Sequence, residues 1–152
     1  EKLKDRIRPS GCYNQKADRL KLITKWWWAR CEDRVDQFDE LSTNELRTEL
    51  LDLKGIGPET ADSILLYAIG RAKFVVDNYT RRIMSRLGKV DEKISYAKLQ
   101  TMFEDNLPFD VALFNDFHAQ FIALAKNHCR VRPICSSCPL NLVCPSVSQY
   151  RL

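Results

Sequence analysis

Apolar residues recur along this chain at helical spacing, and no segment keeps the apolar–polar alternation of a strand. From Tyr13 to about Trp28, apolar side chains return every three or four residues, which predicts a helix after the turn Pro9-Ser10-Gly11. Five further helices are predicted over about 42–51, 58–67, 78–87, 95–106 and 110–126. We therefore expect an all-α protein.

Start and stop signals support these helices. Ser42 and Glu45 have the spacing of a capping box. Pro58 stands where a first helical residue would, and Asp77 is a natural N-cap for a helix that stops at Gly88. Successive helical residues point in different directions, so we expect Trp27 or a neighbour in the Trp26–Trp28 run to pack the core rather than form a stacking platform.

Composition is that of a globular protein, with 45% hydrophobic and 29% charged residues in a chain of 152. The net charge is +4, but acids concentrate in 32–62, and Asp77 is the single acid between Arg71 and Lys89. This distribution suits a surface that docks a polyanion in one orientation, although a solvated helix surface is the alternative. A lobe boundary is expected near 74–77.

The last part of the chain carries four closely spaced cysteines, in the pattern C-x5-C-x2-C-x5-C: Cys129, Cys135, Cys138 and Cys144. Such spacing is typical of metal ligands. One short knuckle with a longer arm on each side favours a [4Fe–4S] cluster over zinc, because the ligands of a cubane spread around a larger body. Two disulfides would require an oxidising compartment, which nothing else in the chain indicates. Cys12 and Cys31 are expected to be small core residues.

The segment Leu53-Lys54-Gly55-Ile56-Gly57-Pro58-Glu59-Thr60-Ala61 predicts a tight hairpin between two helices. The amides around Gly55 and Gly57 would lie at a helix N-terminus, where free N–H groups and the helix dipole bind an anion such as a DNA phosphate. Lys54 could add charge. A plain helix–turn–helix corner is the alternative.

Asp77 follows the apolar run Phe74-Val75-Val76 and precedes a basic helix. Its role as a helix cap would alone justify an aspartate. A carboxylate in a positive, partly apolar environment can also activate a water or stabilise a developing oxocarbenium ion. The two interpretations are compatible.

These features in this order resemble the helix–hairpin–helix DNA glycosylase superfamily, in its endonuclease III branch. The motifs are L-K-G-I-G-P-E-T-A, then V-D-N-Y-T-R-R, then the cysteine loop, and the segment 10–17 is similar to the family pattern G-x-Y-N-x-K-A. The resemblance implies part of a six-helix lobe in 1–76, with the hairpin at 53–61, and a helical lobe in 77–152, with the iron–sulfur loop at 129–144.

By the same resemblance, the protein would bind double-stranded DNA with a damaged or mispaired base, flip that base out and cut its N-glycosidic bond. The resemblance gives Asp77 the catalytic role. It places DNA contacts on Lys54, Gly55, Gly57, Thr60 and Arg81, and cluster ligands on Cys129, Cys135, Cys138 and Cys144.

Two departures from the family pattern matter. Bifunctional members have a lysine in the hairpin that forms a Schiff base, and Glu59 stands at that position here. Since a carboxylate forms no imine, we expect a monofunctional glycosylase without AP-lyase activity, with Lys54 or Lys73 as the alternative nucleophile. The chain also starts inside the family's fold, so we expect an exposed apolar face, and the sequence leaves open whether the chain acts alone.

The motifs are most similar to those of endonuclease III-like 3-methyladenine glycosylases, which implies alkylated purines as substrates. Alkylated purines carry positive charge and a weakened glycosidic bond, which fits a site with one aspartate and no lysine. The alternatives are a mismatch adenine or thymine glycosylase, and a non-catalytic iron–sulfur DNA-binding module. We expect an intracellular monomer, in the cytoplasm and nucleoid or in a nucleus, with no membrane segment.

Overall fold

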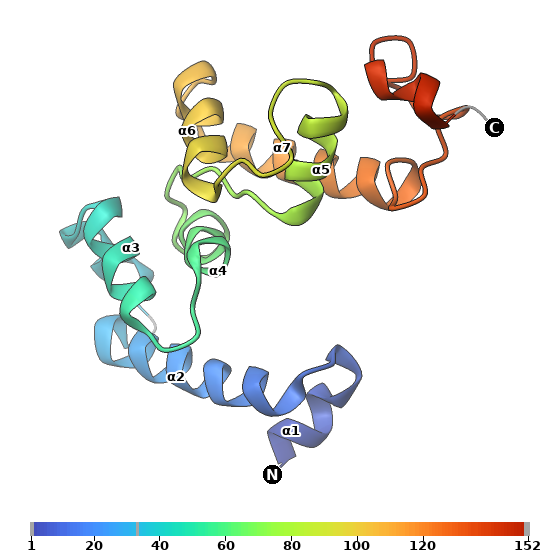
Figure 1. Ribbon diagram of the computed structural model, residues 1–152. Helices are drawn as coiled ribbons and strands as arrows, with labels where there is room; N and C mark the ends of the chain where they lie inside the picture. The colour runs from blue at the N-terminus through green and yellow to red at the C-terminus, as the bar shows by residue number, and fades with distance from the viewer. Residues whose placement is uncertain (1, 33, 151–152) are drawn as a thin grey trace. The chain divides into compact units, whose positions relative to one another are not determined.

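The computed structural model describes residues 2–32 and 34–150, and every regular element in these ranges is a helix (Figure 1). This confirms the predicted all-α class. The elements are α1 (Lys2–Ile7), η1 (Arg8–Ser10), α2 (Tyr13–Cys31), η2 (Val35–Glu40), α3 (Thr43–Asp52), α4 (Pro58–Ser63), η3 (Ile64–Ile69), α5 (Asn78–Arg86), α6 (Tyr96–Asn106), α7 (Val111–Asn127) and η4 (Pro145–Tyr150). None of the helices in the described ranges is long and apolar enough to cross a membrane.

The predicted helices all occur, and their ends show where local signals were weak. The helix predicted over 58–67 is α4 followed by the π-helical segment η3. The predicted N-caps at Ser42 and Asp77 are confirmed, and the Ser42–Glu45 capping box is complete in both directions. The short helix α1 was not predicted, because it buries no residue and so leaves no apolar period in the sequence.

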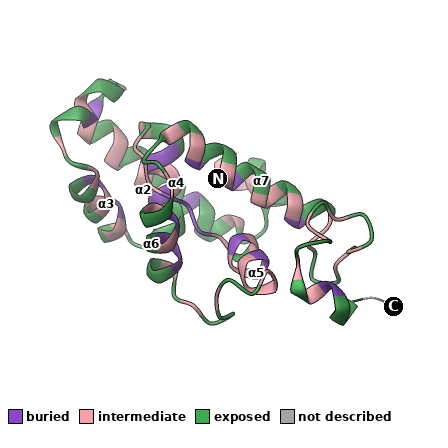
Figure 2. Ribbon diagram, turned by 90° about the horizontal axis from the view of Figure 1, so that it is seen from above, coloured by how far each residue is buried: buried purple, intermediate pink, exposed green. Residues whose placement is uncertain are grey.

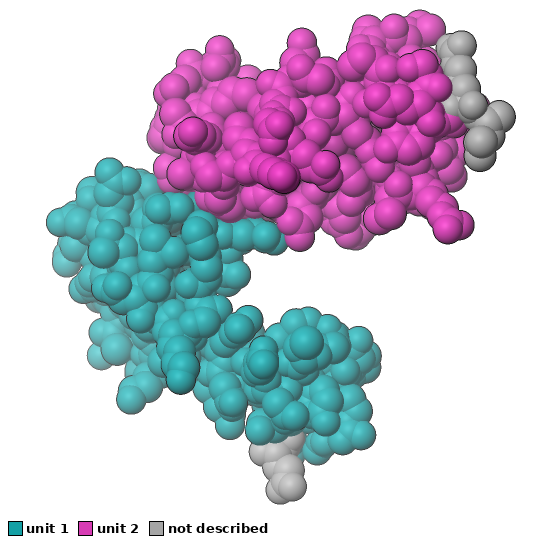
Figure 3. All heavy atoms as spheres, viewed as in Figure 1, with its two compact units in different colours: residues 1–65 teal, residues 66–152 magenta. Residues whose placement is uncertain are grey.

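The chain forms two compact units, residues 1–65 and 66–152 (Figure 3). The sequence placed a lobe boundary later, between Val76 and Asp77. In the structure the apolar run Phe74–Val76 is buried within the second unit. The assignment of 1–76 and 77–152 to the two lobes of the family fold stays a prediction.

The first unit packs around Phe38 of η2, which is fully buried. The rings of Trp26 and Trp27 lie 5.7 and 4.9 Å from the Phe38 ring, centroid to centroid, whereas Trp28 is 58% exposed. This confirms that the tryptophan run contributes to the core. Cys31 is buried as expected, but the same expectation for Cys12 was wrong: Cys12 is exposed, at a left-handed turn before α2 (φ 46°).

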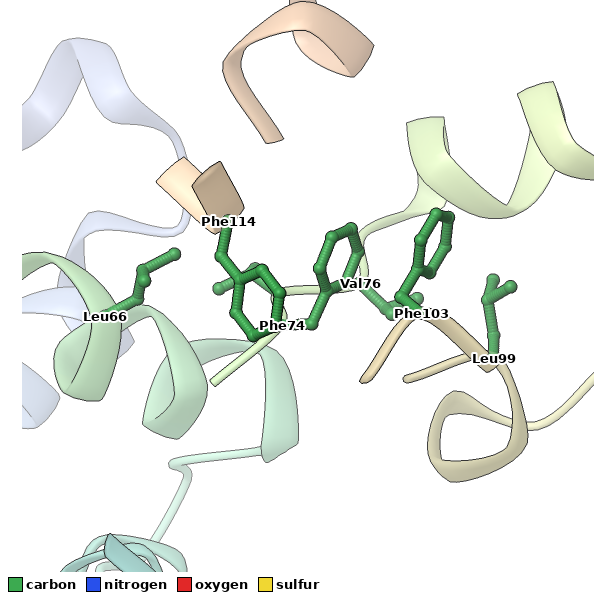
Figure 4. Packing of buried hydrophobic residues seen from close by; sticks show 7 residues of the cluster. Leu66, Phe74, Val76, Leu99, Phe103 and Phe114 are labelled. Carbon is green, nitrogen blue, oxygen red and sulfur yellow. The ribbon is translucent and has the colours of Figure 1, made fainter. Parts of the chain in front are cut away.

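The core of the second unit forms around the extended segment that precedes Asp77 (Figure 4). The Phe74 ring stacks on Phe103 of α6 at 4.0 Å and meets Phe114 of α7 edge-on at 5.3 Å. Side chains of α6 also satisfy the backbone of the segment: Gln100 donates to the Phe74 carbonyl at 2.6 Å, and Glu104 accepts from the Phe74 amide at 3.0 Å. The extended segment is therefore held in place just before Asp77.

In Figure 2 the long helices α2 and α7 are buried on only part of their surface.

Candidate functional site

The hairpin lies in the first unit, between α3 and α4. Ile56 is buried and anchors it, while the predicted contact residues are exposed: Lys54, Gly55, Gly57 and Thr60. The Ile56 amide donates to the Leu53 carbonyl, which closes the turn. The first residue of α4, Pro58, has no N–H, and the Ala61 amide donates to the carbonyl of the N-cap Gly57 at 2.9 Å.

The two hairpin glycines serve different purposes. Gly55 has φ +86°, a conformation that L side chains rarely adopt, and a Cβ there would lie 2.6 Å from Nε of Arg19. Gly57 is the N-cap of α4 with φ −99°, and a Cβ there would meet nothing within 4 Å. The turn therefore requires glycine at 55, whereas at 57 the missing side chain keeps the outer surface open.

Asp77 lies in the second unit as the N-cap of α5. Its Oδ1 accepts hydrogen bonds from the backbone amide of Thr80 at 2.7 Å and from the Thr80 hydroxyl at 2.8 Å. The side chain is 12% exposed. Burial by itself raises the pKa of this carboxyl, but the nearby His118 and the hydrogen bonds from Thr80 outweigh burial and hold the pKa below the ordinary value. Asp77 is thus a shielded carboxylate that stays ionised.

Two residues near Asp77 were missed by the sequence analysis. His118 of α7 is 8% exposed, and its Nε2 lies 3.6 Å from Oδ2 of Asp77. Its Nδ1 lies 2.5 Å from the hydroxyl of Tyr67, on η3. A histidine among the apolar residues of α7 was the one available signal, but nothing local connects it with Asp77.

Two basic residues close to Asp77 in the sequence have defined partners. Arg81 follows one turn after Asp77 on α5; its Nη1 donates to Asn78 at 3.4 Å, and its Nε is buried without a hydrogen bond among the described residues. Lys73 donates to Glu104 at 2.9 Å, with both side chains about 15% exposed. An amine held in this ion pair is a poor nucleophile, which argues against Lys73 as a substitute for the hairpin lysine.

The four loop cysteines come together in the structure. They line one small cavity with Arg86, His128 and Tyr150, and none of them is in a disulfide. Burial, then the charges of Cys138, Cys144 and Cys129, raise the pKa of the Cys135 thiol. No three His, Cys, Asp or Glu side chains in the described ranges are arranged to hold a metal ion. A cubane needs its sulfurs around a larger body, and four free thiols on one cavity provide that donor set.

The end of α5 fastens this loop. Arg86 donates to the Cys129 sulfur at 3.3 Å and to the carbonyls of Arg130 and Val131 at 2.6 and 3.0 Å. Ser146 in turn donates to the Arg86 carbonyl at 2.8 Å. One helix therefore carries Asp77 at its start and holds the cysteine loop at its end, whereas the hairpin belongs to the other unit.

The chain matches known proteins over most of its length. Residues 1–109 match the family model described as HhH-GPD superfamily base excision DNA repair protein. MJ1434 of Methanocaldococcus jannaschii, a protein assigned to the DNA repair glycosylases, is 43% identical over 151 residues, which cover 96% of this chain and 67% of that protein.

Two solved structures are also similar. A non-covalent endonuclease III–DNA complex matches with a TM-score of 0.73 and 26% identity, over 97% of this chain and 65% of that one. The H. pylori 3-methyladenine DNA glycosylase bound to 1,N6-ethenoadenine matches with a TM-score of 0.65 and 31% identity, over 82% of this chain and 62% of that one. The chain thus spans about two thirds of the length of these proteins. It belongs to the HhH-GPD superfamily of base excision DNA repair proteins.

Proposed function

We propose that this chain provides the catalytic aspartate of a monofunctional DNA glycosylase that removes alkylated purines from duplex DNA. The observation that carries the proposal is Asp77, an ionised carboxylate in a largely buried site at the start of α5. Such a group stabilises the positive charge that develops on the sugar as the glycosidic bond breaks, and it can orient or deprotonate the attacking water.

Two observations support alkylated purines as the substrate class. Glu59, exposed on α4, replaces the lysine with which bifunctional relatives attack the sugar. An alkylated purine carries positive charge, so its bond needs less acid–base assistance than that of a neutral base. The similarity to a 3-methyladenine glycosylase supports the same class.

Base release from methylated duplex DNA tests this function, on this chain and on any longer natural form that contains it. We expect free methylated purine, with strand breaks that appear only after hot alkali. Breaks without alkali would contradict the interpretation of Glu59. Release from mismatched duplexes alone would favour a mismatch glycosylase, and binding without release from any duplex would favour the non-catalytic module.

DNA binding is proposed to involve the hairpin, through backbone amides and Lys54. Replacing Lys54 by alanine is expected to weaken binding to all duplexes alike and to reduce the slope of log affinity against log salt by about one. Gly57→Ala removes no charge and fits the backbone, so it is expected to weaken binding about tenfold, through obstruction of phosphate contact, without changing that slope. A Lys54→Ala slope equal to that of wild type would contradict the assignment.

The cysteine loop is proposed to hold a [4Fe–4S] cluster, which when bound would keep the loop folded beside α5. Protein purified without oxygen is expected to contain about four iron atoms per chain. Cys138→Ser is expected to lose the iron and to make residues after α7 sensitive to protease. Cys12→Ser is the matched control, because Cys12 is exposed and outside the loop. Stoichiometric zinc without iron would contradict the proposal.

A further inference from the structure

The neighbourhood of Asp77 contains a buried histidine that the proposed chemistry does not use. His118 lies between Tyr67 Oη, 2.5 Å from its Nδ1, and Asp77 Oδ2, 3.6 Å from its Nε2. Its Nε2 is buried and makes no hydrogen bond within the described residues. The three side chains come from η3, the cap of α5 and α7, all within the second unit.

The contact with Tyr67 determines which nitrogen of a neutral His118 carries the proton. If the Tyr67 hydroxyl donates to Nδ1, then Nε2 carries the hydrogen and directs it at Asp77. Burial and the nearby charge of Asp77 raise the pKa of Tyr67, so its hydroxyl keeps its proton and remains a donor. A separation of 3.6 Å can shorten to a hydrogen bond when DNA binds, since catalytic contacts often tighten only in the complex.

We propose that Tyr67 and His118 act as positioning residues for Asp77: Tyr67 fixes the tautomer of His118, and Nε2–H of His118 orients Oδ2. Oδ1 is already held by Thr80, so the second contact would fix the rotation of the carboxylate. The proposal rests on the proposed function, because it assigns these two residues to the same reaction.

No other charged group competes for this role in the contacts described around Asp77. On α5, Arg81 donates to Asn78, and Arg82 donates to the Cys129 carbonyl at 3.0 Å. Among the described residues, the titratable groups that interact with Asp77 are His118 of α7 and Tyr67 of η3. If His118 were only a packing residue, its replacement would change stability and leave the ionisation of Asp77 unchanged.

Single-turnover base release as a function of pH tests the pair. Without the Nε2–H donor, the ionised form of Asp77 is less favoured, so its pKa rises and the acidic limb of the profile moves to higher pH. His118→Leu is expected to show this shift and a rate about tenfold lower at neutral pH, with unchanged DNA affinity. His118→Gln, which restores an N–H donor, is expected to recover most of both effects, and Tyr67→Phe to show a smaller shift in the same direction.

Tyr96→Phe is the matched control. It removes a hydroxyl that accepts a hydrogen bond at 3.5 Å from the backbone amide of Val76, the residue before Asp77, and the acidic limb should not move. An acidic limb that stays in place in His118→Leu, His118→Gln and Tyr67→Phe alike would overturn the proposal.

Titration of the Asp77 carboxyl by carbon NMR separates this proposal from the proposed function, because it requires no activity. A pKa that rises in His118→Leu and returns in His118→Gln supports the pairing even if the wild type releases no base, in which case the proposed function alone has failed. An active wild type whose Asp77 titrates identically in all variants would overturn the pairing alone.

Discussion

Replacing Asp77 by asparagine is expected to slow base release about a thousandfold, within the range for loss of a general base or an electrostatic stabiliser. Asparagine has the same shape, and its Oδ1 can accept the two hydrogen bonds from Thr80 that the aspartate accepts now. The helix cap should therefore survive while the negative charge is lost. Single-turnover release and duplex affinity, measured together, separate chemistry from binding.

Asp110→Asn is the matched control for this substitution. Asp110 caps α7 as Asp77 caps α5, and its Oδ1 accepts from the Leu113 amide at 2.6 Å. This variant should keep the wild-type rate. If Asp77→Asn also kept that rate, the catalytic assignment would be wrong; if it lost DNA affinity in the same proportion as rate, Asp77 would be a binding residue instead.

The sequence was most informative where a signal is local. Asp77 caps α5 by accepting a hydrogen bond from Thr80, three residues later, and the capping box joins Ser42 to Glu45. The four spaced cysteines lie within one loop. These patterns determine structure almost independently of the rest of the fold. They explain why most of the candidate site could be named by residue before its geometry was known.

What the sequence did not reveal depends on contacts between distant segments. Tyr67 and His118 meet only because η3 and α7 both pack around the segment before Asp77, and neither residue lies in a recognisable pattern. The exposure of Cys12 depends on a left-handed turn before α2, which a pattern of apolar positions does not predict. The acidic stretch 32–62 was likewise interpreted as surface charge, although its last residue, Asp62, is fully buried.

The second large effect is expected at the ion pair between Arg47 and the buried Asp62. Arg47 of α3 contacts both carboxylate oxygens of Asp62 on α4, from Nε at 2.6 Å and from Nη2 at 3.1 Å. The pair joins the helices on either side of the hairpin. Replacing Arg47 by methionine would leave a buried carboxylate without its arginine, and such changes cost about 3–5 kcal/mol.

The free energy of unfolding of the first unit is the quantity to measure. All three tryptophans belong to that unit, so denaturant titrations followed by tryptophan fluorescence report on it directly. Arg30→Met is the matched control: Arg30 binds Glu49, but each side chain of that pair is 34% exposed. A pair so exposed to solvent should contribute at most about 1 kcal/mol.

The double variant Arg47→Met, Asp62→Leu decides between two sources of this effect. If the cost arises because Asp62 is left charged in the interior, then removing both charges should restore most of the stability, since two apolar groups of similar size can replace a buried ion pair. If the double variant is as unstable as Arg47→Met, the arginine contributes through other contacts. If the double variant instead recovers its stability but binds DNA more weakly, the ion pair sets the geometry of the hairpin.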